Sequence, residues 1–281
     1  MKLKKIVTIF AVLTAGFLPA VSSALTMDEL LGVGYGQVLG VSDNQTTSFS
    51  TVVMNQVTGE VVLSKNADSL WVPASLTKLV TAQVLLDLNP NLKERCVVRS
   101  SDNVGGARLY TNNGGVYYLQ DLLGAMLIGS ANNAANALAN CTGMSREQFV
   151  QKMNDKAKSL GAVKTYFFEP SGINEHNQST ALDLAKIAQA AFSTSMIREV
   201  AQKKSVYFCS VGRSKKCHTI KNTNKLFGDP GVDIIAGKTG YLDESRYNFA
   251  ASSKNNQGNY LITVLLGNPT QQEAFDNTRT A

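Results

Sequence analysis

Extended apolar runs lie toward both ends of the chain, and helical spacing dominates its middle. Two runs rich in β-branched residues, 49–55 and 60–64, flank a short turn and predict a hairpin. A further short strand is predicted within 93–99. Extended runs return after residue 205, at 205–210, 232–238, 248–252 and 260–266. Both ends of the chain are therefore expected to supply strands to a sheet.

The part of the chain between these runs, residues 75–200, is predicted to be mainly helical. Apolar residues at 76, 79, 80, 84 and 86 form one stripe, and this helix is expected to end before Asn89-Pro90. Ser145 and Gln148 form a capping box for the helix that follows them. Other helical patterns cover 118–128, 133–140 and 184–192. Strands at both ends with helices between them predict an α+β fold, in which a sheet packs against a helical cluster.

The first residues have the pattern of a secretory signal peptide. Three lysines precede an apolar run at 6–18, which is followed by Pro19 and the small residues Ser22-Ser-Ala24. The run is shorter than the ~20 residues that a membrane-spanning helix needs. We expect cleavage after Ala24, no cysteine-linked lipid anchor, and an exported protein that is periplasmic or secreted. Residues 25–47 then form a lead-in, and 48–281 a catalytic domain without a second domain or a membrane anchor.

The net charge and the cysteines indicate which ligands and crosslinks to expect. Removal of residues 1–24 takes away three lysines and no acidic residue, so the formal net charge falls from +6 to +3. That charge is too small to indicate nucleic-acid binding. Four cysteines in an exported chain favour disulfides. Cys209 and Cys217 flank a polar loop and can close a hairpin, so we predict the pairs Cys209–Cys217 and Cys96–Cys141. A metal site at Cys209, Cys217 and His218 lacks a fourth ligand, and we expect neither a metal nor a cofactor.

The candidate chemistry begins with Ser75 and Lys78 at the start of the first apolar helical segment. Residues three positions apart share one face of a helix, so the hydroxyl and the amine can come within hydrogen-bonding reach. A serine becomes a nucleophile when a neighbouring base takes its proton, and a lysine can be that base if its pKa is lowered by burial or by a nearby cation such as Lys238. A Ser-x-x-Lys pair alone is common by chance.

Two further stretches make the Ser-x-x-Lys pair a significant sequence signal. Ser130-Ala-Asn132 lies at a predicted break between two helices, and Lys238-Thr-Gly240 at the end of a predicted strand. With these three motifs in order, the chain resembles the low-molecular-mass penicillin-binding proteins, which are serine D-alanyl-D-alanine carboxypeptidases and endopeptidases. The resemblance covers about residues 48–268 and includes the segments 168–174, 179–183 and 222–226. It implies the β-lactamase-like fold, with an antiparallel sheet against a helical cluster and the site between them.

The resemblance also implies a role for each motif residue. Ser75 attacks the carbonyl of the penultimate D-alanine of a peptidoglycan stem peptide ending in D-Ala-D-Ala and forms an acyl-enzyme, with Lys78 as general base. Ser130 relays the proton to the leaving amine, and Asn132 holds the peptide amide. β-Lactams are expected to acylate Ser75 as covalent inhibitors.

The same resemblance places the substrate's terminal carboxylate at Lys238 and Thr239. Gly240 lets the substrate lie along the strand edge. The backbone N–H groups of Ser75 and Tyr241 form the oxyanion hole.

The sequence departs from the family pattern at Ala131, at Leu242 and across residues 244–248, and these changes bear on substrate preference. A contact between Arg246 and the substrate carboxylate is one hypothesis, and a solvated arginine is the other. A D,D-endopeptidase using the same site is the main alternative to a carboxypeptidase. Less favoured are a class A-like β-lactamase, because neither Glu169 nor Glu175 has the required sequence setting, and a non-catalytic penicillin sensor.

A Ser-His-Asp hydrolase is disfavoured by the residues present. The sequence has no Gly-x-Ser-x-Gly, and its two histidines, His176 and His218, lie in polar surroundings that favour structural or solvated roles.

Overall fold

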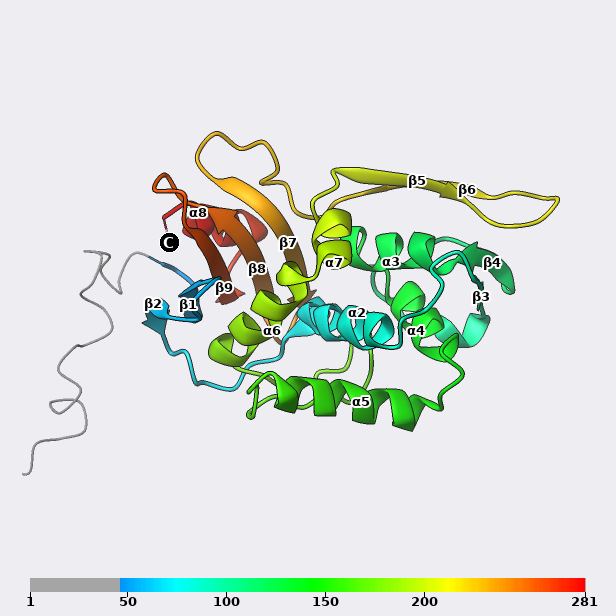
Figure 1. Ribbon diagram of the computed structural model, residues 1–281, viewed down its shortest axis with the longest axis horizontal. Coiled ribbons are helices and arrows are strands. Elements are labelled where there is room, and N and C mark those ends of the chain that lie inside the picture. The colour runs from blue at the N-terminus through cyan, green and yellow to red at the C-terminus, as the bar shows by residue number, and fades with distance from the viewer. Residues whose placement is uncertain (1–45, 281) are drawn as a thin grey trace, which may run out of the picture. The chain divides into compact units, whose positions relative to one another are not determined.

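The computed structural model describes residues 46–280, so the predicted signal peptide and most of the predicted lead-in lie outside the described residues. One sheet contains five antiparallel strands in the order β2-β1-β9-β8-β7 (Figure 1). The strands are β1 (Ser50–Asn55), β2 (Val61–Lys65), β7 (Asp233–Leu242), β8 (Arg246–Lys254) and β9 (Tyr260–Asn268). The prediction of one sheet from both ends of the chain is confirmed.

Both faces of this sheet are covered. Along β8, consecutive side chains point to opposite faces. Ala250 belongs to the main core, whereas Phe249 and Ala251 belong to a smaller core with Phe275. Helix α6 (Ala181–Ser193) contacts β1, β8 and β9, and α8 (Gln271–Thr280) contacts β8 and β9 through the smaller core. The two helices therefore cover opposite faces of the sheet.

The remaining helices form a cluster beside the sheet (Figure 1). They are α2 (Lys78–Asp87), α3 (Leu119–Ile128), α4 (Asn132–Asn140), α5 (Arg146–Ser159) and α7 (Ser195–Ala201). Helix α2 is surrounded by α3, α4, α5 and α6, and all its residues from Lys78 to Leu85 are buried. The prediction of a single buried stripe on this helix is therefore wrong, because neighbours cover it on every side.

Two small hairpins complete the described fold. Strand β3 (Arg95–Val98) pairs with β4 (Gly115–Tyr118), and β5 (Ser205–Cys209) pairs with β6 (Cys217–Lys221). Disulfides join Cys96 to Cys141 and Cys209 to Cys217, which confirms the predicted pairing. Both cysteines of the rejected metal site are thus in a disulfide.

Some helices and strands differ from the predictions. Strand β7 continues to Leu242, so Lys238-Thr-Gly240 lies inside the strand and not at its end. Strand β4 and helix α8 were not predicted, and α7 lies at the end of the segment that was predicted to be mainly helical. Among the described residues, none of the helices has the length and apolar character needed to span a membrane.

Candidate active site

The turn that carries Ser75 joins the sheet side of the molecule to helix α2. Residues Ala74–Thr77 form a 3₁₀ turn, and α2 begins directly after it at Lys78. This tight turn places the two side chains of the Ser-x-x-Lys pair together, and the Lys78 Nζ atom donates a hydrogen bond of 2.8 Å to the Ser75 Oγ atom. Ser75 itself is half-buried and faces a cleft. The predicted contact between hydroxyl and amine is confirmed.

Lys78 is completely buried, which is rare for a lysine. Its Nζ atom also donates to Asn132 Oδ1 at 2.7 Å and to the backbone oxygen of Ser171. Burial lowers the pKa of Lys78 from its ordinary value of 10.5 to about 7, and the negative charge of Glu169 opposes part of that fall. Burial is the main cause of this fall, and Lys238, the cation suggested from the sequence, is not among its causes. The amine is therefore able to act as a base near neutral pH.

The Ser130-Ala-Asn132 motif connects α3 to α4. Ser130 has a φ of 59°, a left-handed conformation that is uncommon for serine, and this bend turns its side chain toward the cleft. Asn132 is the first residue of α4, and its Nδ2 atom donates to the backbone oxygen of Gly105 at 2.8 Å. Asn132 thus connects the buried lysine to the loop that forms one wall of the cleft.

Lys238 approaches the same centre from the sheet. It is 1% exposed, and its Nζ atom donates to Ser130 Oγ at 2.8 Å. Burial first, and then the nearby positive charge of Lys78, hold the pKa of Lys238 well below its ordinary value. The site therefore contains two pairs of a buried amine and a serine hydroxyl, Lys78 with Ser75 and Lys238 with Ser130. Each pair can exchange a proton across its hydrogen bond.

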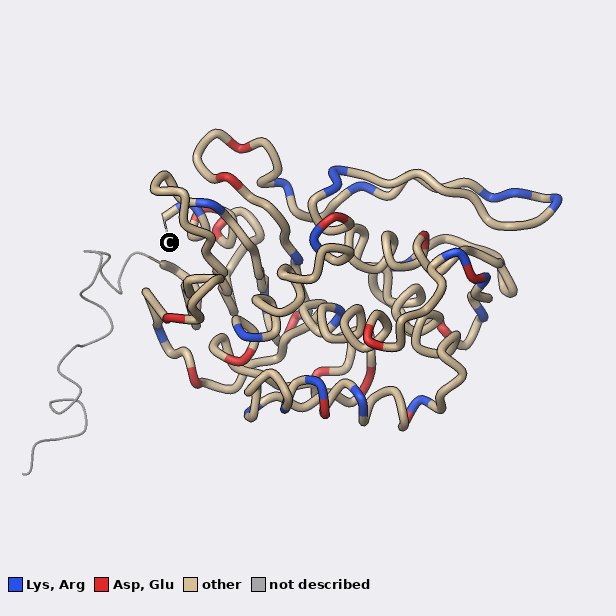
Figure 2. The backbone as a smooth tube through the Cα atoms, in the orientation of Figure 1, with Lys and Arg blue, Asp and Glu red and all other residues tan. Residues whose placement is uncertain are grey.

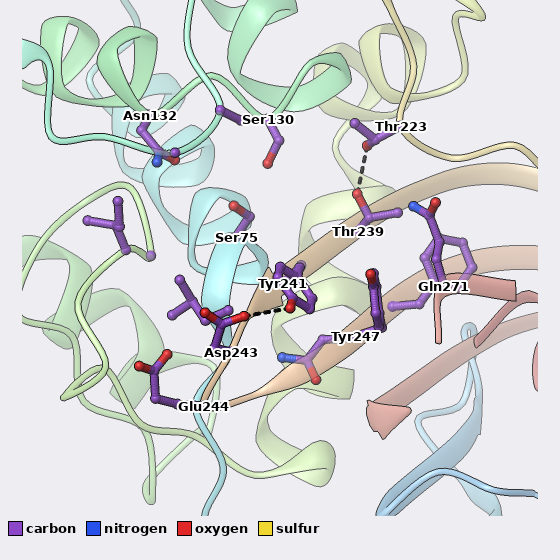
Figure 3. Close-up of a pocket in the computed structure, with 18 of the residues that line it drawn as sticks. Ser75, Ser130, Asn132, Thr223, Thr239, Tyr241, Asp243, Glu244, Tyr247 and Gln271 are labelled. Carbon is purple, nitrogen blue, oxygen red and sulfur yellow. Dashed lines mark hydrogen bonds between the residues drawn. The ribbon is translucent and has the colours of Figure 1, made fainter. Parts of the chain in front are cut away.

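Strand β7 is an edge of the five-stranded sheet, and its free side borders the cleft. Thr239 on this strand shares a hydrogen bond of 2.6 Å with the hydroxyl of Thr223 (Figure 3). A Cβ atom at Gly240 would lie 3.0 Å from the backbone oxygen of Pro73 and 3.3 Å from the backbone nitrogen of Ser75. Glycine is favoured here because the strand passes directly beside the Ser75 turn and a side chain would crowd its backbone.

The cleft at this junction has a volume of about 740 Å³. Figure 3 shows Ser75, Ser130 and Asn132 on one side and Thr239 with Thr223 on another. Further lining residues include Tyr241, Glu175, Tyr247, Asn248, Gln271 and Phe275. The hydroxyl of Tyr241 donates to Asp243 at 2.6 Å, and its ring lies 4.4 Å from that of Tyr247. All eight predicted site residues therefore lie in the cleft or, for the two buried lysines, directly behind it.

The loop from Phe168 to Asn177 contacts both Lys78 and the turn that carries Ser75. The Glu169 carboxylate accepts hydrogen bonds from the backbone nitrogens of Ser171 and Gly172 and from Asn177 Nδ2 at 2.6, 2.5 and 2.9 Å. Gly172 has a φ of 80°, and a Cβ atom there would lie 2.0 Å from the backbone oxygen of Ala74. Glu169 thus organises the loop that accepts a hydrogen bond from Lys78.

Several functional contacts were not predicted from the sequence. Thr223, Glu169 and Gly172 all lie in segments that marked the family resemblance, which is the only sequence signal for them. Arg246 is exposed and is not among the residues that line the cleft, so the structure favours the solvated arginine. Neither histidine lines the cleft, and His218 shares a hydrogen bond of 3.0 Å with the Tyr117 hydroxyl.

Comparisons with known proteins agree with this geometry. A family model described as D-alanyl-D-alanine carboxypeptidase matches residues 37–270. The chain is 35% identical to a D-alanyl-D-alanine endopeptidase from Haemophilus influenzae, with 83% of this chain and 80% of the relative covered. It is 33% identical to the D-alanyl-D-alanine carboxypeptidase DacF from Bacillus subtilis, with 80% of this chain and 58% of the relative covered. The solved structure of a DD-transpeptidase from Streptomyces is 29% identical, with a TM-score of 0.79 over 85% of this chain and 97% of that one.

Proposed function

Because the chain belongs to the D-alanyl-D-alanine carboxypeptidase family, we propose that it is a serine peptidase that removes the terminal D-alanine from peptidoglycan stem peptides ending in D-Ala-D-Ala. The observation that carries the proposal is the hydrogen bond between Ser75 and the buried Lys78. A lysine whose pKa is about 7 is neutral in a large fraction of molecules at neutral pH. It can therefore take the hydroxyl proton without help from a histidine.

Acylation follows from these positions. Lys78 accepts the proton as Ser75 Oγ forms a bond to the carbonyl carbon of the penultimate D-alanine. The backbone N–H groups of Ser75 and Tyr241 stabilise the oxyanion, and Gly240 allows the strand that carries Tyr241 to approach the Ser75 turn. The carbon–nitrogen bond then breaks, and Ser130 passes a proton to the departing amine. Lys78 resupplies Ser130 with that proton and becomes neutral again.

Substrate binding uses the sheet edge and the buried cation. The free edge of β7 offers backbone groups to an extended peptide, and the Asn132 side chain holds its amide. Thr239 and Lys238 hold the terminal carboxylate. A bound carboxylate favours the protonated form of Lys238, so substrate binding itself restores the positive charge that burial disfavours. This charge then supports Ser130 as the proton donor.

Deacylation needs a water molecule and a base. Lys78 is neutral again after acylation and can accept a proton from the water that attacks the ester. Glu169 is engaged by backbone donors of its own loop and does not line the cleft, which argues against a β-lactamase-like role for it. Glu175 lies at the exposed rim. We therefore infer that β-lactams acylate Ser75 and are released slowly.

D,D-endopeptidase activity is the second candidate function. The relative from Haemophilus influenzae, which matches most of both chains, is named as an endopeptidase. Both activities break the same kind of bond and differ in the amine that leaves, which is free D-alanine in one case and a neighbouring stem peptide in the other. The same catalytic residues serve both.

The two disulfides fit an oxidising compartment, and the substrate lies outside the cytoplasm. We place the protein in the periplasm or among secreted proteins, with the cell wall as its substrate.

The test supplies the purified protein with a pentapeptide ending in D-Ala-D-Ala and with a crosslinked muropeptide dimer. Release of free D-alanine that is lost in Ser75→Ala supports the carboxypeptidase. Cleavage of the dimer without release of D-alanine assigns the endopeptidase instead. Binding of penicillin at Ser75 with no turnover of either substrate contradicts both peptidase functions.

A further inference from the structure

The β5–β6 hairpin and its flanks carry a charge pattern that the catalytic site does not use. Between Glu199 and Asp229 the sequence contains seven basic residues and no acidic residue. These residues, which we call the basic arm, are Lys203, Lys204, Arg213, Lys215, Lys216, Lys221 and Lys225. All seven are exposed, and within residues 46–280 none of them forms an ion pair. Figure 2 shows basic positions and no acidic ones along the hairpin.

The hairpin holds these charges in place. Its inner face packs on α3, and the rings of Phe208 and His218 lie 5.8 and 5.7 Å from that of Tyr117 on β4. The Cys209–Cys217 disulfide closes the hairpin just before its tip. Arg213, Lys215 and Lys216 lie in the loop beyond this disulfide, and the ends of the loop are also held by a hydrogen bond of 2.8 Å from the backbone nitrogen of Ser210 to the backbone oxygen of Lys216.

The inner end of the basic arm joins the active-site cleft. Lys221 is the last residue of β6, and Thr223 follows two positions later. Thr223 lines the cleft and bonds the hydroxyl of Thr239 at 2.6 Å. A polymer that leaves the cleft on this side therefore meets Lys221 first.

The outer end of the arm also contacts an element of the cleft. Lys216 shares a hollow of about 250 Å³ with Arg108 and Tyr110. The Arg108 guanidinium lies 5.0 Å from the centre of the Tyr110 ring, and Tyr110 is 68% exposed. Gly106 and Ala107, which directly precede Arg108, line the active-site cleft. Cations thus lie at both ends of a surface that borders the site, and an exposed aromatic ring lies at its outer end.

We propose that the basic arm is a second binding surface for the peptidoglycan strand whose stem peptide occupies the cleft. Uncut stem peptides carry free carboxylates at regular intervals along a glycan, so the polymer is a polyanion that fits a row of unpaired cations. The identity of this polymer rests on the proposed peptidase function. A membrane surface fits less well, because the exposed face of the hairpin presents Tyr207, Thr219 and Lys221 without the large aliphatic side chains that anchor proteins in an interface.

The test separates polymer binding from catalysis. In a Ser75→Ala background, which leaves the polymer intact, the tip variant Arg213→Gln/Lys215→Gln/Lys216→Gln is compared with its parent for co-sedimentation with purified peptidoglycan. We expect about tenfold weaker binding by the tip variant, and binding by the parent that weakens as salt is added. With Ser75 intact, the same three substitutions should change hydrolysis of the soluble pentapeptide by less than about twofold, because the tip lies outside the cleft.

The matched control removes the same charge elsewhere, with Lys93→Gln/Lys152→Gln/Lys158→Gln at exposed positions away from the hairpin. This control should bind peptidoglycan as the parent does, and labelling by fluorescent penicillin verifies that each Ser75-containing variant is folded. Unchanged binding by the tip variant, or an equal loss in the control, overturns the proposal. Tip-dependent binding to phosphatidylglycerol vesicles with no tip-dependent binding to peptidoglycan overturns it in favour of a membrane. Failure of the protein with Ser75 intact to cleave either the pentapeptide or the crosslinked dimer rejects the peptidase function and is read separately from the binding result.

Discussion

The Lys78 amine lies 2.8 Å from the Ser75 hydroxyl and has no exposure to solvent. Only the neutral amine can accept the proton of Ser75, and burial lowers the pKa of Lys78 to about 7. We therefore expect the rate of acylation by a penicillin to rise as pH increases through about 7 and then to level off. The measurement is the second-order rate constant for acylation as a function of pH.

The rise of the acylation rate with pH, and the pH at which it levels off, test whether Lys78 is the base. Below its pKa the lysine is protonated and donates to Ser75, so the hydroxyl is not activated. A lysine with an ordinary pKa of 10.5 would leave the rate still rising far above neutral pH. Lys78→Ala should remove the activity at every pH. An acylation rate that is flat across about pH 5–9 would contradict the assignment of Lys78 as the base.

Glu169 is expected to set both the pH profile and the stability of its loop. Its negative charge raises the pKa of Lys78, so Glu169→Gln should shift the acid limb of the acylation profile to lower pH. The amide nitrogen of glutamine would also replace one of the two acceptor oxygens and face either the donor of Ser171 or those of Gly172 and Asn177, with a loss of about 1–3 kcal/mol in the free energy of unfolding. Glu175→Gln at the exposed rim serves as the control and should change neither quantity. A profile that does not move would show that Glu169 has no electrostatic effect on the base.

Gly172 is expected to tolerate no side chain. Its Cβ atom would lie 2.0 Å from the backbone oxygen of Ala74, so Gly172→Ala must displace the turn that carries Ser75. Gly143→Ala is a matched control, because Gly143 has a similar positive φ of 77° and no neighbouring atom within 4 Å of the added carbon. The control should lose about 1–2 kcal/mol from backbone strain alone. Gly172→Ala should lose more stability and most of its penicillin acylation, as measured by urea unfolding and by labelling; equal effects in both variants would reject the packing role.

Much of the fold was predictable because the patterns that define it are local. The β-branched runs that became β1 and β2, the extended runs that became β8 and β9, and the capping box at Ser145 are visible within a few residues. Helix α8 was missed because its ten residues are mostly polar, and it buries Ala274 and Phe275 only against the sheet. The extent of burial of α2 was underestimated because it depends on helices that come later in the chain.

In the candidate site, too, local relationships could be predicted and long-range contacts could not. Ser75 and Lys78 could be paired from their spacing, since three positions in a helical turn fix their separation. The role of Glu169 could not be derived in this way. The loop that it organises contacts Lys78 through the backbone oxygen of Ser171, which is 93 positions away in the sequence. Lys238-Thr-Gly240 was placed at a strand end because the predicted extended run ended at residue 238. The structure continues β7 through Gly240, which pairs with Asn248 of β8 and lies close beside the Ser75 turn.

The two disulfides are expected to contribute unequally to stability. Cys96–Cys141 closes a separation of 45 residues between β3 and the end of α4, whereas Cys209–Cys217 closes one of 8 within a hairpin. Loop-closure entropy gives about 4 kcal/mol for the first and about 2.5 kcal/mol for the second. Urea unfolding of the two double alanine variants should therefore show the larger loss for Cys96→Ala/Cys141→Ala. Removal of the hairpin disulfide should leave penicillin acylation intact, because Ser75 and its partners lie outside that hairpin; a loss of acylation there would mean that the hairpin helps to hold the cleft in its active form.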